Sequence, residues 1–150
     1  MEFDDNVFIE AVSTHFSYLV EEFSYLTPNA YETVNGSFVD YINPKLGLLV
    51  RIEYSYRNKT IMCTLFNAIK NSKPISFRNE HKVTVPALLS QRGGNEMSRY
   101  MDYMPEVIGL IQSCAKVAEL LHKLGSNILS GVRWISAQEI IDADKKNNGM

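Results

Sequence analysis

The chain has 150 residues, a formal net charge of −2 and a hydrophobic fraction of 45%. These values are typical of one folded domain with its own core, and they exclude an intrinsically disordered chain. No apolar run approaches the roughly 18 residues that a membrane-spanning helix needs. The acidic start, Met1 to Asp5, lacks the basic residues and the apolar stretch of a signal peptide. We therefore expect a soluble, cytoplasmic protein.

The charges are segregated along the chain. The first 44 residues hold eight acidic residues and no Lys or Arg, a balance of −8, whereas residues 45–92 hold nine basic and two acidic residues, a balance of +7. Such segregation bears on partners and on association rates. Two interpretations stay open: the blocks neutralise each other on the folded surface, or the acidic block faces a basic partner.

The first element is predicted to be an amphipathic helix that starts after Asp4 or Asp5, which suit a helix N-terminus. Apolar residues recur at helical spacing along one stripe. Thr27-Pro28-Asn29 should end the helix, because the residue before proline avoids the helical region. The members of the stripe are Phe8, Val12, Phe16, Leu19, Phe23 and Leu26.

An antiparallel meander is predicted next. Asn35-Gly36 indicates a tight turn between Tyr31–Val34 and Ser37–Asn43. Leu46–Tyr56 alternates between apolar and polar residues, and Thr60–Ile69 forms a further strand after a short turn. Strands joined by such short connections run antiparallel.

The second half is predicted to be mainly helical. Asn71-Ser72-Lys73-Pro74 is expected to break the sheet, and Val83-Thr84-Val85 favours a short strand. Pro86–Gln91 then favours one or two helical turns, and Arg92–Asn95 favours a loop. A long helix should start near Pro105 and stop at Gly125. Ser136-Ala137-Gln138-Glu139 has capping-box spacing and predicts a helix to about Asp144.

The predicted fold class is α+β in a single domain, residues 1–150. It comprises an N-terminal helix, an antiparallel meander of three to four strands, then C-terminal helices packed on one face of the sheet. Residues 143–150 are expected to form a frayed tail.

No motif in the sequence specifies a reaction. His15, His81 and His122 lack metal-ligand spacing, and no nucleophile elbow or phosphate-binding glycine loop occurs. Cys63 and Cys114 are flanked by apolar residues, which favours buried, reduced thiols. We therefore expect no catalytic residues, no metal site and no cofactor.

Two other functions are compatible with parts of the sequence. The polar segment 78–95 could serve a small enzyme or a ligand-binding domain, but a solvated, charge-rich loop is favoured, because no spacing of its residues specifies a role. Tyr54 and Tyr56 beside Arg51 and Arg57 resemble a stacking platform for nucleic acid. However, both tyrosines share a face with the apolar residues of their strand, and the pI of 5.9 argues against binding phosphate.

The first helix carries a candidate protein-binding patch. Tyr18 and Tyr25 are seven residues apart, which places both on one side of an unbroken helix, away from the apolar stripe. Glu21 and Glu22 lie beside them. Exposed aromatic residues among carboxylates suit the binding of a basic protein. Alternatively, Tyr25 packs against the following loop and the glutamates only keep the helix soluble.

The layout resembles that of the small bacterial immunity proteins of polymorphic and contact-dependent growth inhibition toxin systems. The resemblance covers most of the chain and lies in the order of its segments, not in a diagnostic motif. After the acidic amphipathic helix come Phe38–Pro44, the hairpin of Leu48–Tyr54 and Ile61–Leu65, a helix ending in Ala118–Gly125, and Ile128–Gly131.

The resemblance implies a protein that binds one toxin domain, which could be a nuclease, in the cytoplasm and occludes its active or essential surface. It implies neither direct nucleic-acid binding nor membrane binding. We expect the contact surface to comprise Glu10, Tyr18, Glu21, Glu22, Tyr25 and Asp40. A subunit of a homo-oligomer that associates through this patch remains an alternative.

Overall fold

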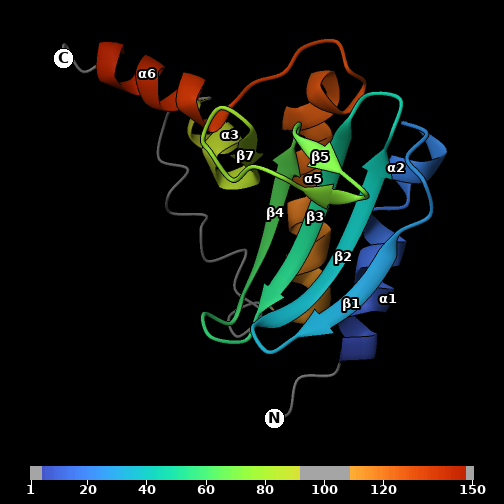
Figure 1. Cartoon of the computed structure of the whole chain (residues 1–150). Helices are drawn as coiled ribbons and strands as arrows, with labels where there is room; N and C mark the ends of the chain where they lie inside the picture. The colour runs from blue at the N-terminus through green and yellow to red at the C-terminus, as the bar shows by residue number, and fades with distance from the viewer. Residues whose placement is uncertain (1–4, 92–108, 148–150) are drawn as a thin grey trace.

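A five-stranded antiparallel sheet, in the order β1-β2-β3-β4-β7, organises the computed structural model of the chain (Figure 1). The structure describes residues 5–91 and 109–147. Its elements are α1 (Asp5–His15), α2 (Tyr18–Glu21), β1 (Asn29–Thr33), β2 (Gly36–Asn43), β3 (Leu48–Ser55), β4 (Thr60–Phe66), β5 (Ile69–Lys70), β6 (Lys73–Pro74), β7 (Lys82–Thr84), α3 (Val85–Gln91), α5 (Leu110–Leu129) and α6 (Ala137–Asn147).

The helices α1 and α5 lie side by side behind one face of this sheet (Figure 1). That face carries the alternating apolar residues of the strands, such as Val50, Ile52 and Tyr54 of β3, all of which are buried. The intervening residues Arg51 and Glu53 point to the opposite face. The predicted α+β class and the predicted placement of the C-terminal helices are thus confirmed.

The sheet has one strand more than the largest number predicted. The short strand expected near Val83 pairs with β4 and forms the fifth strand at the edge, with Leu65 opposite Val83. The turn before β2 also differs slightly, because Thr33 pairs with Gly36 and the loop is Val34-Asn35. A Cβ atom on Gly36 would lie 2.2 Å from the carbonyl oxygen of Tyr54, so only glycine fits beside β3.

The prediction of one unbroken N-terminal helix is wrong. Helix α1 ends at His15, and α2 is a single turn that ends at Glu21. Ser24 then adopts a positive φ of 63°, and the N–H of Leu26 already donates to the carbonyl oxygen of Ile42 in β2. The chain therefore leaves the helical path before Pro28, and Leu26 is 55% exposed rather than part of the core stripe.

Helix α5 does not stop at Gly125 as predicted. It continues to Leu129, and the left-handed residue is Gly131, with a φ of 80°. Gly125 is buried, and a Cβ there would lie 3.0 Å from Cδ1 of Leu121, so this glycine serves close packing. The predicted start near Pro105 lies outside the described residues.

The capping interaction predicted for the last helix is present, since Ser136 Oγ accepts a hydrogen bond from the Glu139 N–H at 3.1 Å. Helix α6 extends to Asn147, beyond the predicted end at Asp144.

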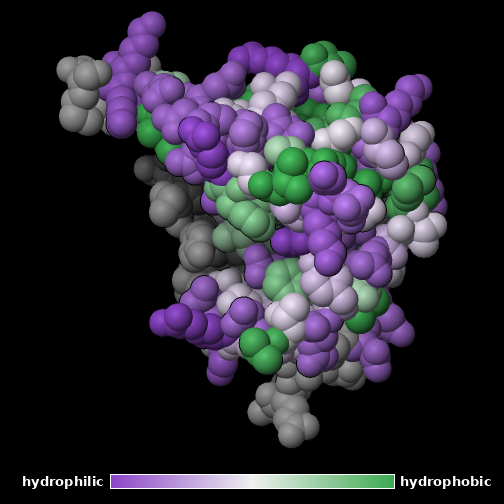
Figure 2. Space-filling model, in the orientation of Figure 1, coloured by the Kyte–Doolittle hydropathy of each residue, from purple (hydrophilic) through white to green (hydrophobic). Residues whose placement is uncertain are grey.

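A small hairpin, β5–β6, projects across the sheet face that the helices leave free (Figure 1). Seen from the same side, the surface of the molecule carries a mixture of hydrophilic and hydrophobic residues (Figure 2). Asn71 and Ser72 form its two-residue turn, with φ values of 53° and 64°. Positive φ at both central residues is the geometry of a type I′ turn, which suits the twist of a hairpin. The segment predicted only to break the sheet thus forms a second, two-stranded sheet.

Candidate functional site

The six residues predicted to contact a partner do not lie on one surface. The carboxylates of Glu10, Glu21 and Glu22 are exposed on α1, on α2 and directly after α2. The others are more enclosed: Tyr18 is half-buried, whereas Tyr25 and Asp40 are 2% and 4% exposed.

The predicted exposure of the two tyrosines is wrong. Tyr18 donates a hydrogen bond to the carbonyl oxygen of Ala118 at 2.7 Å, and Tyr25 donates one to that of Leu129 at 3.2 Å. Both bonds attach the N-terminal segment to α5. Burial raises the pKa of both phenols well above the ordinary value. The break after His15 turns these side chains toward the core, which an unbroken helical periodicity could not predict.

Asp40 is likewise an internal residue and not part of an exposed acidic patch. Its two carboxylate oxygens accept hydrogen bonds from Nε and Nη2 of Arg51, at 2.9 and 3.1 Å. The hydroxyl of Tyr31 donates a third, at 3.1 Å. Asp40 and Arg51 are direct partners across β2 and β3, so strand register brings them together. Burial is the main cause that raises the pKa of Tyr31 to about 12, followed by the charge of Asp40.

The exposed carboxylates of the N-terminal segment form what we call the acidic helix surface, made of Glu10, Glu21 and Glu22. Glu22 accepts a hydrogen bond from Nε2 of His122 at 2.8 Å. Glu10 and Glu21 make no ion pair within the part of the chain that the structure describes. Val20, next to Glu21, is 38% exposed and adds apolar area.

One ion pair agrees with the interpretation that the acidic and basic blocks neutralise each other. The pair between Asp40 and Arg51 joins the two blocks. The pair between Arg78 and Glu80 lies within the second block, and Glu22 pairs with a histidine outside both. Glu10 and Glu21 therefore keep their charges toward solvent.

The free face of the sheet carries a second group of side chains, which we call the sheet-face cluster: Tyr31, Phe38, Asp40, Arg51 and Phe66. The rings of Tyr31 and Phe38 stack with centroids 5.1 Å apart and planes 8° from parallel. The guanidinium of Arg51 lies 5.6 Å from the ring centroids of both Phe38 and Phe66. Such cation–π contacts, with the ion pair, hold Arg51 in one orientation.

Glu53, which follows the cluster along β3, is half-buried, and the pKa of its carboxyl is raised. Burial is the largest cause, the charge of Arg51 acts in the opposite direction, and the charge of Asp40 adds to the rise. The free face thus carries two carboxylates that influence each other.

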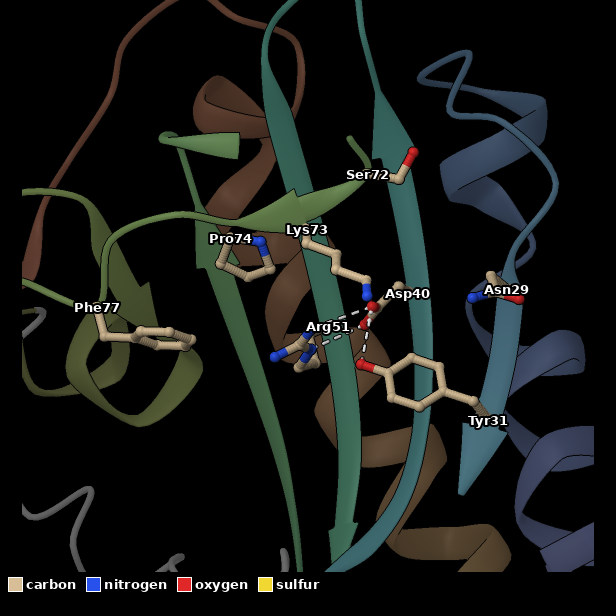
Figure 3. A pocket seen from close by; sticks show the side chains of 8 residues that line it. All are labelled: Asn29, Tyr31, Asp40, Arg51, Ser72, Lys73, Pro74 and Phe77. Atoms are coloured by element: carbon tan, nitrogen blue, oxygen red, sulfur yellow. Dashed lines mark hydrogen bonds and ion pairs between the residues drawn. The ribbon is translucent and has the colours of Figure 1, made fainter. Parts of the chain in front are cut away.

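A cavity of about 440 Å³ opens between the sheet-face cluster and the β5–β6 hairpin (Figure 3). The sheet supplies the ion pair of Asp40 and Arg51, and the hairpin side supplies Lys73 and Phe77. The residues that line it are Asn29, Tyr31, Asp40, Arg51, Ser72, Lys73, Pro74 and Phe77. This site was not predicted from the sequence, although the alternation of Leu46–Tyr56 predicts that Arg51 lies on the face opposite the apolar residues.

Neither a family model, nor a curated protein, nor a solved structure matches the chain.

The polar segment considered for a ligand site is only partly described. Arg78 and Glu80 are exposed and bind each other, with Nη2 and Oε1 2.9 Å apart. His81 Nδ1 lies 2.7 Å from Ser76 Oγ. Arg92–Asn95 lies outside the described residues. In the described part of this segment, the polar side chains pair with neighbours in the sequence. The nearby cavity is lined only by residues that precede Arg78.

Both cysteines are free and buried, and burial raises the pKa of each thiol, for Cys114 to about 12. Within residues 5–91 and 109–147, no three His, Cys, Asp or Glu side chains are grouped so that they could hold a metal ion. None of the helices described there is long and apolar enough to cross a membrane.

Proposed function

We propose that the chain is a protein-binding inhibitor of the immunity type, which neutralises a cognate bacterial toxin domain by covering its active site or another essential surface. The observation that carries the proposal is the acidic helix surface. Glu10 and Glu21 stay exposed and without an ion pair among the described residues. Inhibition by occlusion needs no catalytic residue.

Electrostatics supports a basic partner. Exposed carboxylates that are not internally paired attract a cationic surface and speed its encounter with the chain. A nuclease domain that grips phosphates presents such a surface, and carboxylates can occupy the places of the phosphates. Val20, which is exposed next to Glu21, supplies apolar contact that charges alone do not give.

The contact set proposed here is smaller than the one expected from the sequence. It keeps Glu10, Glu21 and Glu22, whereas Tyr18 and Tyr25 position the N-terminal segment on α5. Asp40 instead holds Arg51 in the sheet.

Co-expression with the product of the neighbouring gene tests the proposal. We expect that product to arrest growth when expressed alone, and co-expression of this chain to restore growth. The two proteins should elute as one complex whose affinity falls as salt is raised, because screening weakens attraction between exposed charges. If growth is not restored and no complex forms at low salt, the proposal is wrong.

Light scattering on the isolated chain separates the proposal from self-association. An inhibitor with an unlike partner should keep the same mass over a wide range of concentration. A mass that rises with concentration and falls on charge reversal at Glu21 would instead indicate a homo-oligomer that uses this surface.

A further inference from the structure

The cavity on the free face of the sheet has the construction of a small-molecule site. Three residues of the sheet-face cluster, Tyr31, Asp40 and Arg51, form its floor, and the β5–β6 hairpin covers it (Figure 3). Its volume of about 440 Å³ falls in the range usual for ligand pockets, roughly 300–1,000 Å³. It lies on the sheet face opposite the helices, so it is distinct from the acidic helix surface (Figure 1).

The hydrogen bonds of the floor determine what charge the cavity accepts. Asp40 already accepts two bonds from Arg51 and one from Tyr31, and Arg51 balances its charge. The side chain of Lys73 points into the cavity toward Asp40 (Figure 3). Lys73 makes no ion pair with any residue in the described ranges. Its ammonium group is therefore an additional positive charge at the mouth of the cavity.

The neighbouring carboxylates limit the number of negative charges that a ligand can carry. Asp40 lines the cavity, and Glu53 follows Arg51 by two residues on the same face of β3. Lys73 can balance one negative charge of a ligand, whereas these carboxylates would repel a second one without compensation. The other end of the cavity is apolar, since Pro74 lines it and the ring of Phe77 is 60% exposed there. An exposed aromatic ring at a cavity mouth gains stability when an apolar ligand covers it.

We propose that this cavity binds a small organic monocarboxylate. The carboxylate pairs with Lys73, and the amide of Asn29, on the β1 side of the cavity, is a further donor. The apolar body covers Pro74 and Phe77. Binding here does not depend on the proposed inhibitor function.

Nuclear magnetic resonance titration with benzoate, phenylacetate and hexanoate tests the proposal. We expect at least one of them to give saturable shifts of the backbone amides of Tyr31, Lys73 and Phe77. Benzamide, which has the shape of benzoate but no charge, should bind about tenfold more weakly or not at all, because a charge-assisted hydrogen bond is lost.

Two lysine variants provide the matched comparison. Lys73→Met should weaken carboxylate binding about tenfold or more, since it removes the charge that pairs with the ligand. Lys70→Met removes the same charge from the opposite strand of the hairpin, at a residue that does not line the cavity, and should change affinity less than about twofold. An unchanged amide spectrum away from the hairpin confirms that each variant folds.

Three outcomes would overturn the proposal. The first is the absence of saturable shifts with all three carboxylates. The second is equal binding of benzoate and benzamide. The third is an equal effect of the two lysine variants. None of these outcomes bears on binding of a partner to the acidic helix surface. Failure of the ligand proposal is therefore distinguishable from failure of the proposed function.

Discussion

Asp40 and Arg51 face each other across β2 and β3 and are joined by two hydrogen bonds, Nε to Oδ1 at 2.9 Å and Nη2 to Oδ2 at 3.1 Å. Both side chains are largely shielded from water, with 5% and 16% of their surface exposed. A paired charge in such a place stabilises only as long as its partner remains. The pair therefore contributes to the floor of the cavity as one unit.

Loss of one member of this pair should be costly. Asp40→Ala leaves the guanidinium of Arg51 shielded without its carboxylate, and we expect the free energy of unfolding to fall by about 2–3 kcal/mol. The double variant Asp40→Leu, Arg51→Met should recover most of this loss, because it removes both charges and keeps apolar volume. Urea denaturation at pH 7 measures both effects.

The exposed pair of Arg78 and Glu80 is the matched control. Its side chains are 73% and 47% exposed, so Glu80→Ala should lower stability by less than about 1 kcal/mol. Equal losses for Asp40→Ala and Glu80→Ala would show that shielding from water is not what makes the internal pair important.

The raised pKa of Glu53 predicts a dependence of stability on pH. A carboxyl whose pKa is higher in the folded than in the unfolded state binds more protons when folded, in the interval above its ordinary pKa. The stabilising contribution of the Glu53 carboxyl is therefore complete below its ordinary pKa and is lost as the pH rises through its folded-state pKa. Glu53→Gln should raise the free energy of unfolding at pH 7, and the gain should vanish near pH 4. A gain that is equal at both pH values would contradict this cause.

The two tyrosines are predicted to act on stability and not on partner binding. Tyr25→Phe removes the buried hydroxyl that donates to Leu129 and should cost about 1 kcal/mol. Tyr18→Phe removes the corresponding bond to Ala118, with a similar loss. Thermal denaturation measures the loss. A variant with unchanged stability and weaker partner binding would instead show that the tyrosines belong to the contact surface.

The sheet was predictable because its signals are local. The alternation of β3 and the short connections determine which residues face the helices and which strands pair. The short strand at Val83 was also visible, but its place at the edge beside β4 depends on long-range pairing. For the same reason, the sequence contains Asp40 and Arg51 as separate charges and does not reveal that they meet.

The N-terminal segment was harder to predict because a small departure from helical geometry redirects every later side chain. After His15 the helix is interrupted, and Ser24 adopts a left-handed conformation that periodicity does not anticipate. Tyr25 is turned into the core by this change, whereas Glu10, which precedes it, is exposed as expected. The exposed part of the predicted contact surface is thus the set of its three glutamates.

Charge reversal on the acidic helix surface, measured against the purified product of the neighbouring gene, tests the central claim most directly. Glu10→Lys with Glu21→Lys should weaken the complex at low salt by about tenfold or more and remove most of its salt dependence. Asp142→Lys with Asp144→Lys, an equal change in charge on exposed α6, should have little effect. A complex that forms with undiminished affinity after reversal of Glu10 and Glu21 would contradict the claim that this surface binds the partner.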